Sequence, residues 1–199
     1  MKRLSLYLFL ILFSFQTPSL TDDIRDFEIE GMSLGDSLLD YMKKSLIKSE
    51  INNKKITFYY EDKYVSISAW EIRNKFKTYS DVGIVFNPND NKYEILSLEG
   101  TLTFDNIDQC HKKQKEIAKE IKKSLDLQIK EEIWFVEKER ITKDLFSVKN
   151  IDFNFSKDLN KGSIVIVCYD IKDKNKKDLL YVTINSAEFD LYLVDRAKN

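Results

Sequence analysis

One serine near the start of the chain has the neighbours of a hydrolase nucleophile. Residues 31–35, GMSLG, match G-x-S-x-G, in which a sharp turn between a strand and a helix exposes the serine. That chemistry requires a large parallel sheet and a histidine late in the chain, whereas this chain has one histidine, His111, in its middle. A helix N-cap at Ser33 explains the same residues, and we interpret the string as a cap.

A second serine lies in the overlapping string GDSL at residues 35–38. This string resembles the signature of the GDSL family of secreted esterases and lipases, in which a D-x-x-H block supplies the acid and base. Residues 108–111 read DQCH, so the resemblance implies a triad of Ser37, Asp108 and His111. A serine hydroxyl needs such a base because it is a weak nucleophile at neutral pH.

Three features depart from that family's pattern. The histidine block lies in mid-chain, the G-x-N-D oxyanion block is absent, and Ser37 falls within an expected helix. Missing oxyanion donors cost a factor of about a hundred or more in rate. An ester hydrolase is therefore the alternative interpretation, and no catalytic residue belongs to the leading one.

Metal and cofactor sites are not expected. One histidine and two cysteines are too few ligands for a structural zinc site. The carboxylates at the start of the exported chain lack the order of a calcium loop, so we interpret them as solvated charge; they are Asp22, Asp23, Asp26, Glu28 and Glu30.

The two cysteines, Cys110 and Cys168, predict a disulfide. An even number of cysteines in an exported chain favours pairing. Such a bridge would stabilise the fold by roughly 4 kcal/mol through loop closure. The alternative is a pair of buried thiols.

The first twenty residues have the order of a secretory signal peptide. Lys2 and Arg3 precede an apolar run over residues 4–15, which is shorter than the roughly 20 residues that span a membrane. We expect cleavage after Thr21, with Ser19 as the alternative site, and a periplasmic or secreted location. Retention of residues 1–21 as a membrane tether is a further alternative.

Charge argues against nucleic acid as a partner. Loss of Lys2 and Arg3 takes the formal net charge from −1 to −3, and acidic and basic residues are interspersed. We expect an envelope protein or a small ligand as the partner instead, with no stable membrane span after cleavage.

The elements that would position these residues are strands and helices of a single domain over residues 22–199. A short strand at residues 27–30 precedes a helix over residues 33–42, whose Leu34, Leu38 and Met42 recur at steps of four. Alternating residues then predict two hairpins, 56–60 with 65–69 and 82–86 with 93–98, followed by a bulge or kink at Gly100. Loops this short join antiparallel strands.

The second half predicts a long amphipathic helix over residues 106–125, capped by Asn106 and burying Cys110 against a strand. Strands follow at 151–155, 163–171 and 179–184, and a final helix begins after Asn185 or Ser186. Residues 126–150 are left open apart from a strand core at 133–136. The fold class is α+β: an antiparallel β-meander with a long helix packed on it and short terminal helices.

The segment FEIEGMSLGDSLLDY at residues 27–41 resembles the opening of a group of uncharacterised small exported proteins from AT-rich marine alphaproteobacteria. Cys110, the strand with Cys168 and residues 182–189 fit the same group. The resemblance implies an exported α+β protein of no known activity. A non-enzymatic binding or interaction module of the cell envelope is thus the leading interpretation.

Overall fold

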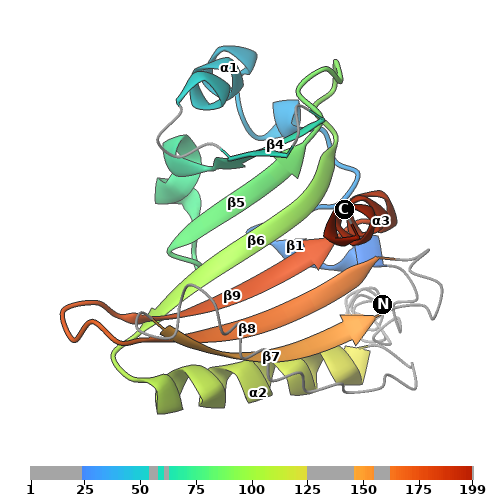
Figure 1. Cartoon of the computed structure of the whole chain (residues 1–199). Helices are drawn as coiled ribbons and strands as arrows, with labels where there is room; N and C mark the ends of the chain where they lie inside the picture. The colour runs from blue at the N-terminus through green and yellow to red at the C-terminus, as the bar shows by residue number, and fades with distance from the viewer. Residues whose placement is uncertain (1–23, 54–57, 61–62, 125–145, 155–161, 199) are drawn as a thin grey trace, which may run out of the picture.

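The computed structural model describes residues 24–53, 58–60, 63–124, 146–154 and 162–198. Within these ranges the chain forms an α+β fold, as predicted, with one seven-stranded antiparallel sheet (Figure 1). The strands are β3 (Phe58–Tyr60), β4 (Tyr64–Ser68), β5 (Asp81–Phe86), β6 (Ile95–Phe104), β7 (Phe146–Asn154), β8 (Ser163–Ile171) and β9 (Asp178–Asn185). The helices are α1 (Lys44–Asn52), α2 (Ile107–Ser124) and α3 (Ala187–Ala197).

The strand order, β3-β4-β5-β6-β9-β8-β7, joins two meanders at the centre of the sheet. The predicted hairpins are confirmed as β3 with β4 and β5 with β6. After β6 the chain passes through α2 to the far edge and returns through β7 and β8, so that β9 pairs with β6 over eight residues. The predicted strand core at residues 133–136 lies outside the described residues.

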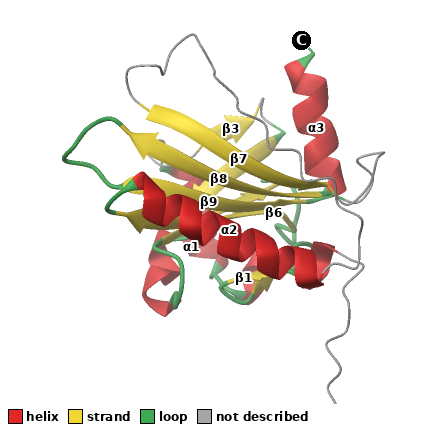
Figure 2. Ribbon diagram, turned by 90° about the horizontal axis from the view of Figure 1, so that it is seen from below, coloured by secondary structure: helices red, strands yellow, loops and turns green. Residues whose placement is uncertain are grey.

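Helix α2 covers one face of the sheet, chiefly over β8 and β9 (Figure 2). Asn106 caps it, since its side-chain oxygen accepts a hydrogen bond of 3.1 Å from the N–H of Gln109. Seven apolar strand residues on this helix face are 4% exposed or less, and burial of each stabilises the fold by roughly 1.5–3 kcal/mol; they are Ile67, Ile84, Leu98, Ile164, Ile166, Leu180 and Val182.

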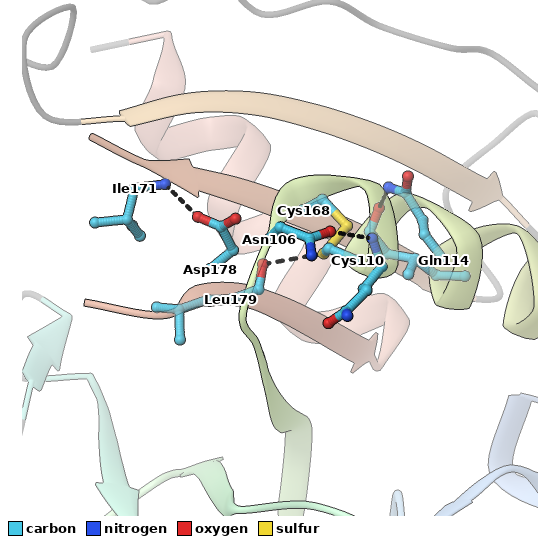
Figure 3. The surroundings of a disulfide bond; sticks show 9 residues. Asn106, Cys110, Gln114, Cys168, Ile171, Asp178 and Leu179 are labelled. Atoms are coloured by element: carbon cyan, nitrogen blue, oxygen red, sulfur yellow. Dashed lines mark hydrogen bonds between the residues drawn. A yellow bond between two sulfur atoms is a disulfide. The ribbon is translucent and has the colours of Figure 1, made fainter. Parts of the chain in front are cut away.

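The predicted disulfide is confirmed and fastens α2 to β8. Cys110 and Cys168 are bonded and fully buried beneath the helix (Figure 3). One turn further along α2, the side-chain amide of Gln114 donates a hydrogen bond of 2.8 Å to the carbonyl of Ile166. A covalent bond and a buried hydrogen bond therefore fix the helix to the same strand.

The predicted helix over residues 33–42 is wrong. The chain forms a small hairpin of β1 (Glu28–Ile29) and β2 (Met32–Ser33), then a 3₁₀ turn at Leu38–Asp40, and α1 begins only at Lys44. Gly35 has a φ of 87°, and the N–H groups of Gly35 and Leu38 donate to carbonyls of Ile95 and Tyr93. The backbone thus pairs with the start of β6 instead of with itself.

The apolar pattern that suggested the helix is nevertheless real. Leu34, Leu38 and Met42 are all at most 4% exposed and join the core on the helix face. Turns and the bridge to Glu94 place these three side chains in the core. A spacing of four residues between buried positions therefore does not require a helix here.

The predicted bulge at Gly100 is also wrong. Gly100 lies in regular register between Val82 and Val182, and the register shift in this pair of strands falls at Val85 and Phe86. A Cβ atom at Gly100 would lie 2.6 Å from the ring of Tyr79. The glycine is therefore needed for close packing of that ring and not for a kink.

Helix α3 lies on the opposite face of the sheet, at one end (Figures 1 and 2). Ser186 is its N-cap, accepting a hydrogen bond of 3.3 Å from the N–H of Phe189, as predicted. Phe189 packs with Tyr64, Val85 and Leu96 in a second apolar cluster. The far end of this face is not part of that cluster.

Candidate functional site

The structure separates the members of the triad that the GDSL resemblance implies. Ser37 forms a bridge with Glu94, directly before β6, whereas Asp108 and His111 lie in the first turns of α2, after the other end of β6. Ten residues of strand span about 30 Å. Ser37 is therefore far outside hydrogen-bond reach of His111.

The hydroxyl of Ser37 also has a structural role. It donates a hydrogen bond of 2.7 Å to the carbonyl of Lys92 and accepts one of 3.3 Å from the N–H of Leu39. These contacts cap the 3₁₀ turn and tie it to the loop before β6.

Ser33 lies in β2 and is neither a helix cap nor a strand-to-helix elbow. Its N–H donates a hydrogen bond of 2.9 Å to the carboxylate of Asp36. The hydroxyl of Tyr41 lies 2.5 Å from the same carboxylate. This part of the GMSLGDS segment is a hydrogen-bonded turn that fixes the hairpin to the rest of the chain.

The N-terminal carboxylates are dispersed among the described residues. Asp26 and Glu28 are exposed, whereas the Glu30 carboxylate accepts hydrogen bonds of 2.7–2.8 Å from the N–H groups of Lys77, Thr78 and Tyr79. Asp22 and Asp23 lie outside the described residues. Across the described ranges, no three histidine, cysteine or acidic side chains gather as metal ligands.

A more promising surface is the part of the sheet that faces away from α2 and is not covered by α3. We call it the polar face. Strand alternation places on it side chains that are almost all half-buried or exposed, in contrast to the buried helix face; they are Ser66, Ser68, Asp81, Gly83, Glu99, Thr101, Thr103, Val165, Val167, Tyr169, Leu179, Tyr181 and Thr183.

Glu99 is the carboxylate at the centre of the polar face. It lies on β6 between Gly83 of β5 and Thr183 of β9, and the Thr183 hydroxyl donates a hydrogen bond of 3.3 Å to Glu99 Oε2. Burial raises the pKa of Glu99, and the carboxylate of Asp81 raises it further, against the effect of the Thr183 hydrogen bond. The Glu99 charge is therefore poorly solvated in the protein alone.

Gly83 leaves space beside this carboxylate. The three atoms nearest to a Cβ atom built on Gly83 all belong to Glu99, the closest at 3.6 Å, which is an ordinary contact distance. The backbone of Gly83 does not adopt a positive φ. The described structure around Gly83 would therefore accept a larger residue.

Two tyrosines border the same area. Tyr169 and Tyr181, on neighbouring strands, pack edge to face with ring centroids 5.2 Å apart. Burial raises the pKa of both phenols, and the Glu99 carboxylate raises each further, to about 12 for Tyr181. Both rings are thus neutral at physiological pH and lie within the electrostatic field of Glu99.

Taken together, the polar face has a desolvated carboxylate at its centre, with a position without a side chain on β5 to one side and hydroxyl groups and tyrosine rings on β9 and β8 to the other. Such an arrangement can hold a small ligand by charge, hydrogen bonds and ring contacts. The sequence of β6 indicates one polar and one largely apolar face. Its alternating polar residues are Ser97, Glu99, Thr101 and Thr103, and the residues between them are Leu98, Gly100, Leu102 and Phe104. The contribution of β9 could not be anticipated from sequence, since its pairing with β6 spans nearly eighty residues of chain.

No protein-family model, curated protein or solved structure matches this chain. None of the helices in the described ranges is long and apolar enough to cross a membrane. What the polar face can bind therefore follows from its own geometry.

Proposed function

We propose that this chain is a non-enzymatic binding module of the cell envelope, exported to the periplasm or secreted, which holds a small ligand on the polar face. The observation that carries this proposal is the pairing of Gly83 with Glu99. A strand-centre glycine lies directly opposite a half-buried carboxylate, on the side of the sheet that α2 does not cover.

Glycine inside a strand costs roughly 0.5–1 kcal/mol relative to alanine, so its presence needs a reason. Gly100 makes room for the ring of Tyr79, and Gly162 has a φ of 86° with its Cβ position 2.2 Å from the Asn185 carbonyl. Gly83 shows neither constraint. A glycine inside a strand marks a bulge, a tight bend or the close approach of a ligand or another backbone. The register shift of β5 falls at Val85 and Phe86 and not at Gly83, so we take Gly83 as a position for a ligand.

Two features support export. The apolar run at residues 4–15 has the order of a signal peptide, and a buried disulfide suits an oxidising compartment.

Nuclear magnetic resonance titration of the oxidised, exported protein tests the proposal. The probes are tetramethylammonium and 1,5-diaminopentane, glycerol and glucose, and citrate and inorganic phosphate. We expect at least one to shift the methyl signals of Val165, Leu179 and Thr183, while Ile29 and Ile47 in the core beneath the other face remain unchanged. Absence of shifts on the polar face with all six solutes would overturn the proposal.

The variant Gly83→Val fills the space beside Glu99 with methyl groups. Valine favours strands and the Cβ position is unhindered, so we expect a folded protein that has lost the titration shifts. Thr78→Val, an exposed threonine in the loop before β5 and outside the polar face, is the matched control and should bind as the wild type does. Gly83→Ala provides a smaller obstruction should the valine variant be unstable.

A fluorophosphonate probe separates this function from the hydrolase alternative. Because Ser37 is distant from His111 and both hydrogen-bonding capacities of its hydroxyl are engaged, we expect no labelling of Ser37. Covalent labelling at Ser37 that disappears in Ser37→Ala would contradict the binding-module proposal.

A further inference from the structure

We propose that the ligand of the polar face is a small organic ammonium ion, held by the charge of Glu99 between the space left by Gly83 on β5 and the rings of Tyr181 and Tyr169 on β9 and β8. This inference rests on the proposed function and specifies the chemistry of its ligand.

The charge of this surface selects a cation. The seven strands contain one basic residue, Lys149 on β7, and the ionisable acids described on the polar face are Glu99 and Asp81. Asp81 Oδ1 already accepts a hydrogen bond of 2.7 Å from Ser68. Within the described part of the chain, Glu99 has only the longer contact with Thr183, so an incoming positive charge would compensate a carboxylate that burial has left poorly solvated.

The rings favour an organic cation over a metal ion. The face of a tyrosine ring attracts an ammonium group. The attraction is stronger for an organic ammonium ion, because its methyl or methylene groups leave the charge less hydrated. Cations already occupy such positions elsewhere in this protein: Lys63 lies 4.7 Å from the ring of Tyr64, and Arg73 lies 4.7 Å from that of Trp70.

A hard divalent metal requires more oxygen ligands than this surface presents. Calcium takes six to eight oxygens and magnesium six. Glu99 and Asp81 are the carboxylates described on this face, and no third histidine, cysteine or acidic side chain joins them as a metal ligand among the described residues. The space at Gly83 can hold the organic substituents of an ammonium ion, whereas a metal ion has no such substituents to place there.

The groups that face Glu99 set the expected pH dependence. They are Asp81 of β5 and the phenols of Tyr60, Tyr169 and Tyr181, with Arg196 of α3 beside Tyr60. The phenols stay neutral below about pH 10, so ionisation of Glu99 dominates. Affinity for the cation should therefore rise as the pH increases through the elevated pKa of Glu99.

Calorimetric and resonance titrations with tetramethylammonium test the inference, with tert-butanol as the neutral analogue of similar shape. We expect tetramethylammonium to bind on the polar face and tert-butanol not to bind. Glu99→Gln should weaken binding at least about tenfold and abolish its pH dependence, as loss of a partly buried charge pair implies. Tyr181→Leu should weaken it about threefold or more through loss of the ring. Thr78→Val, an exposed threonine in the loop before β5 and outside the polar face, should have no effect.

The outcomes separate this inference from the function on which it rests. If glucose, glycerol, citrate or phosphate shifts the polar-face signals and tetramethylammonium does not, the ammonium inference fails while the binding function stands. Equal competition by millimolar magnesium, or full retention of affinity in Glu99→Gln, would likewise overturn the inference. Absence of binding by every probe overturns both.

Discussion

Ser163, the first residue of β8, donates a hydrogen bond of 3.0 Å to Asp190 in the first turn of α3, and both side chains are buried. Ser163 also lies 3.5 Å from the side-chain amide nitrogen of Asn185, whose oxygen accepts a hydrogen bond of 2.6 Å from Ser97. The register shift between β5 and β6 leaves Leu96 as the extra residue, so that Ser97 pairs with Val85 on the α3 side of the sheet. A polar chain thus links three strands to α3.

Asp190, at the end of that chain, has a buried and incompletely hydrogen-bonded carboxylate among the described residues. Burial raises its pKa, although hydrogen bonds from Ser163 and Asn185 act in the opposite direction. Asp190 Oδ2 is buried without a hydrogen-bond partner among the described residues. The ionised form is therefore held at a cost in the folded protein.

We predict that Asp190→Asn stabilises the protein at pH 8 by on the order of 1 kcal/mol. The folded-state pKa of Asp190 lies above that of the unfolded chain, so the stability contributed by this group is fully present below the unfolded value and is lost as pH rises through the folded value. Urea unfolding at pH 4.5 and pH 8 should show this fall in the wild type and a smaller one in the variant. Asp108→Asn, an exposed aspartate in the first turn of α2, controls for the loss of a helix-terminal charge. Equal pH slopes in wild type and Asp190→Asn would contradict the prediction.

We predict that loss of the disulfide lowers the free energy of unfolding by roughly 4 kcal/mol, because the bridge spans 58 positions of sequence. The double variant Cys110→Ala, Cys168→Ala and the reduced wild type should both show the loss in urea unfolding. Alanine removes the thiols without introducing an unpaired hydroxyl beneath α2. A difference below about 1 kcal/mol would show that packing of α2 alone positions β8.

Two glycines on neighbouring strands should respond oppositely to alanine. We predict that Gly100→Ala destabilises the fold by about 1–3 kcal/mol, because its Cβ would lie 2.6 Å from the Tyr79 ring. Gly83→Ala should be neutral or stabilising by up to about 1 kcal/mol, because its nearest neighbour is 3.6 Å away. Thermal unfolding of the two variants in parallel gives the comparison. Similar losses in both would mean that Gly83 is needed for folding, which would weaken the case for a ligand there.

We predict that Glu30→Gln loosens the contact between the N-terminal hairpin and the loop before β5. Burial alone would raise the pKa of Glu30, but the N–H groups of Lys77, Tyr79 and Thr78 outweigh it and lower the pKa. The stabilisation is thus present above the pKa of the unfolded chain and is lost as the pH falls through the folded value.

Amide hydrogen exchange is the appropriate measurement for that contact. The amides of residues 77–79 should exchange several-fold faster in Glu30→Gln at pH 7, and in the wild type they should lose protection towards acid pH. Glu28→Gln, an exposed neighbour in the same hairpin, is the control and should leave them unchanged. Unchanged protection in Glu30→Gln would show that the carboxylate does not hold the loop.

Local interactions made much of the fold readable in advance. The hairpins, the α2 cap at Asn106 and the α3 cap at Ser186 depend on residues a few positions apart, whose preferences act whatever the distant chain does. The pairing of Cys110 with Cys168 was also predicted, because an even number of cysteines in an exported chain favours pairing and the apolar stripe of the expected helix faced Cys110 towards a strand.

Sequence by itself determined the composition of each element, the apolar stripe of α2 and the polar alternation of β6. Tertiary structure decided which strands became neighbours. Pairing of β6 with β9 cannot be predicted from local preference, because the backbone hydrogen bonds between strands do not depend on residue type. That pairing brings Thr183 to Glu99. The same distant contacts turned residues 33–42 from an expected helix into a bridge with β6, because carbonyls at Tyr93 and Ile95 offered these N–H groups partners outside the segment.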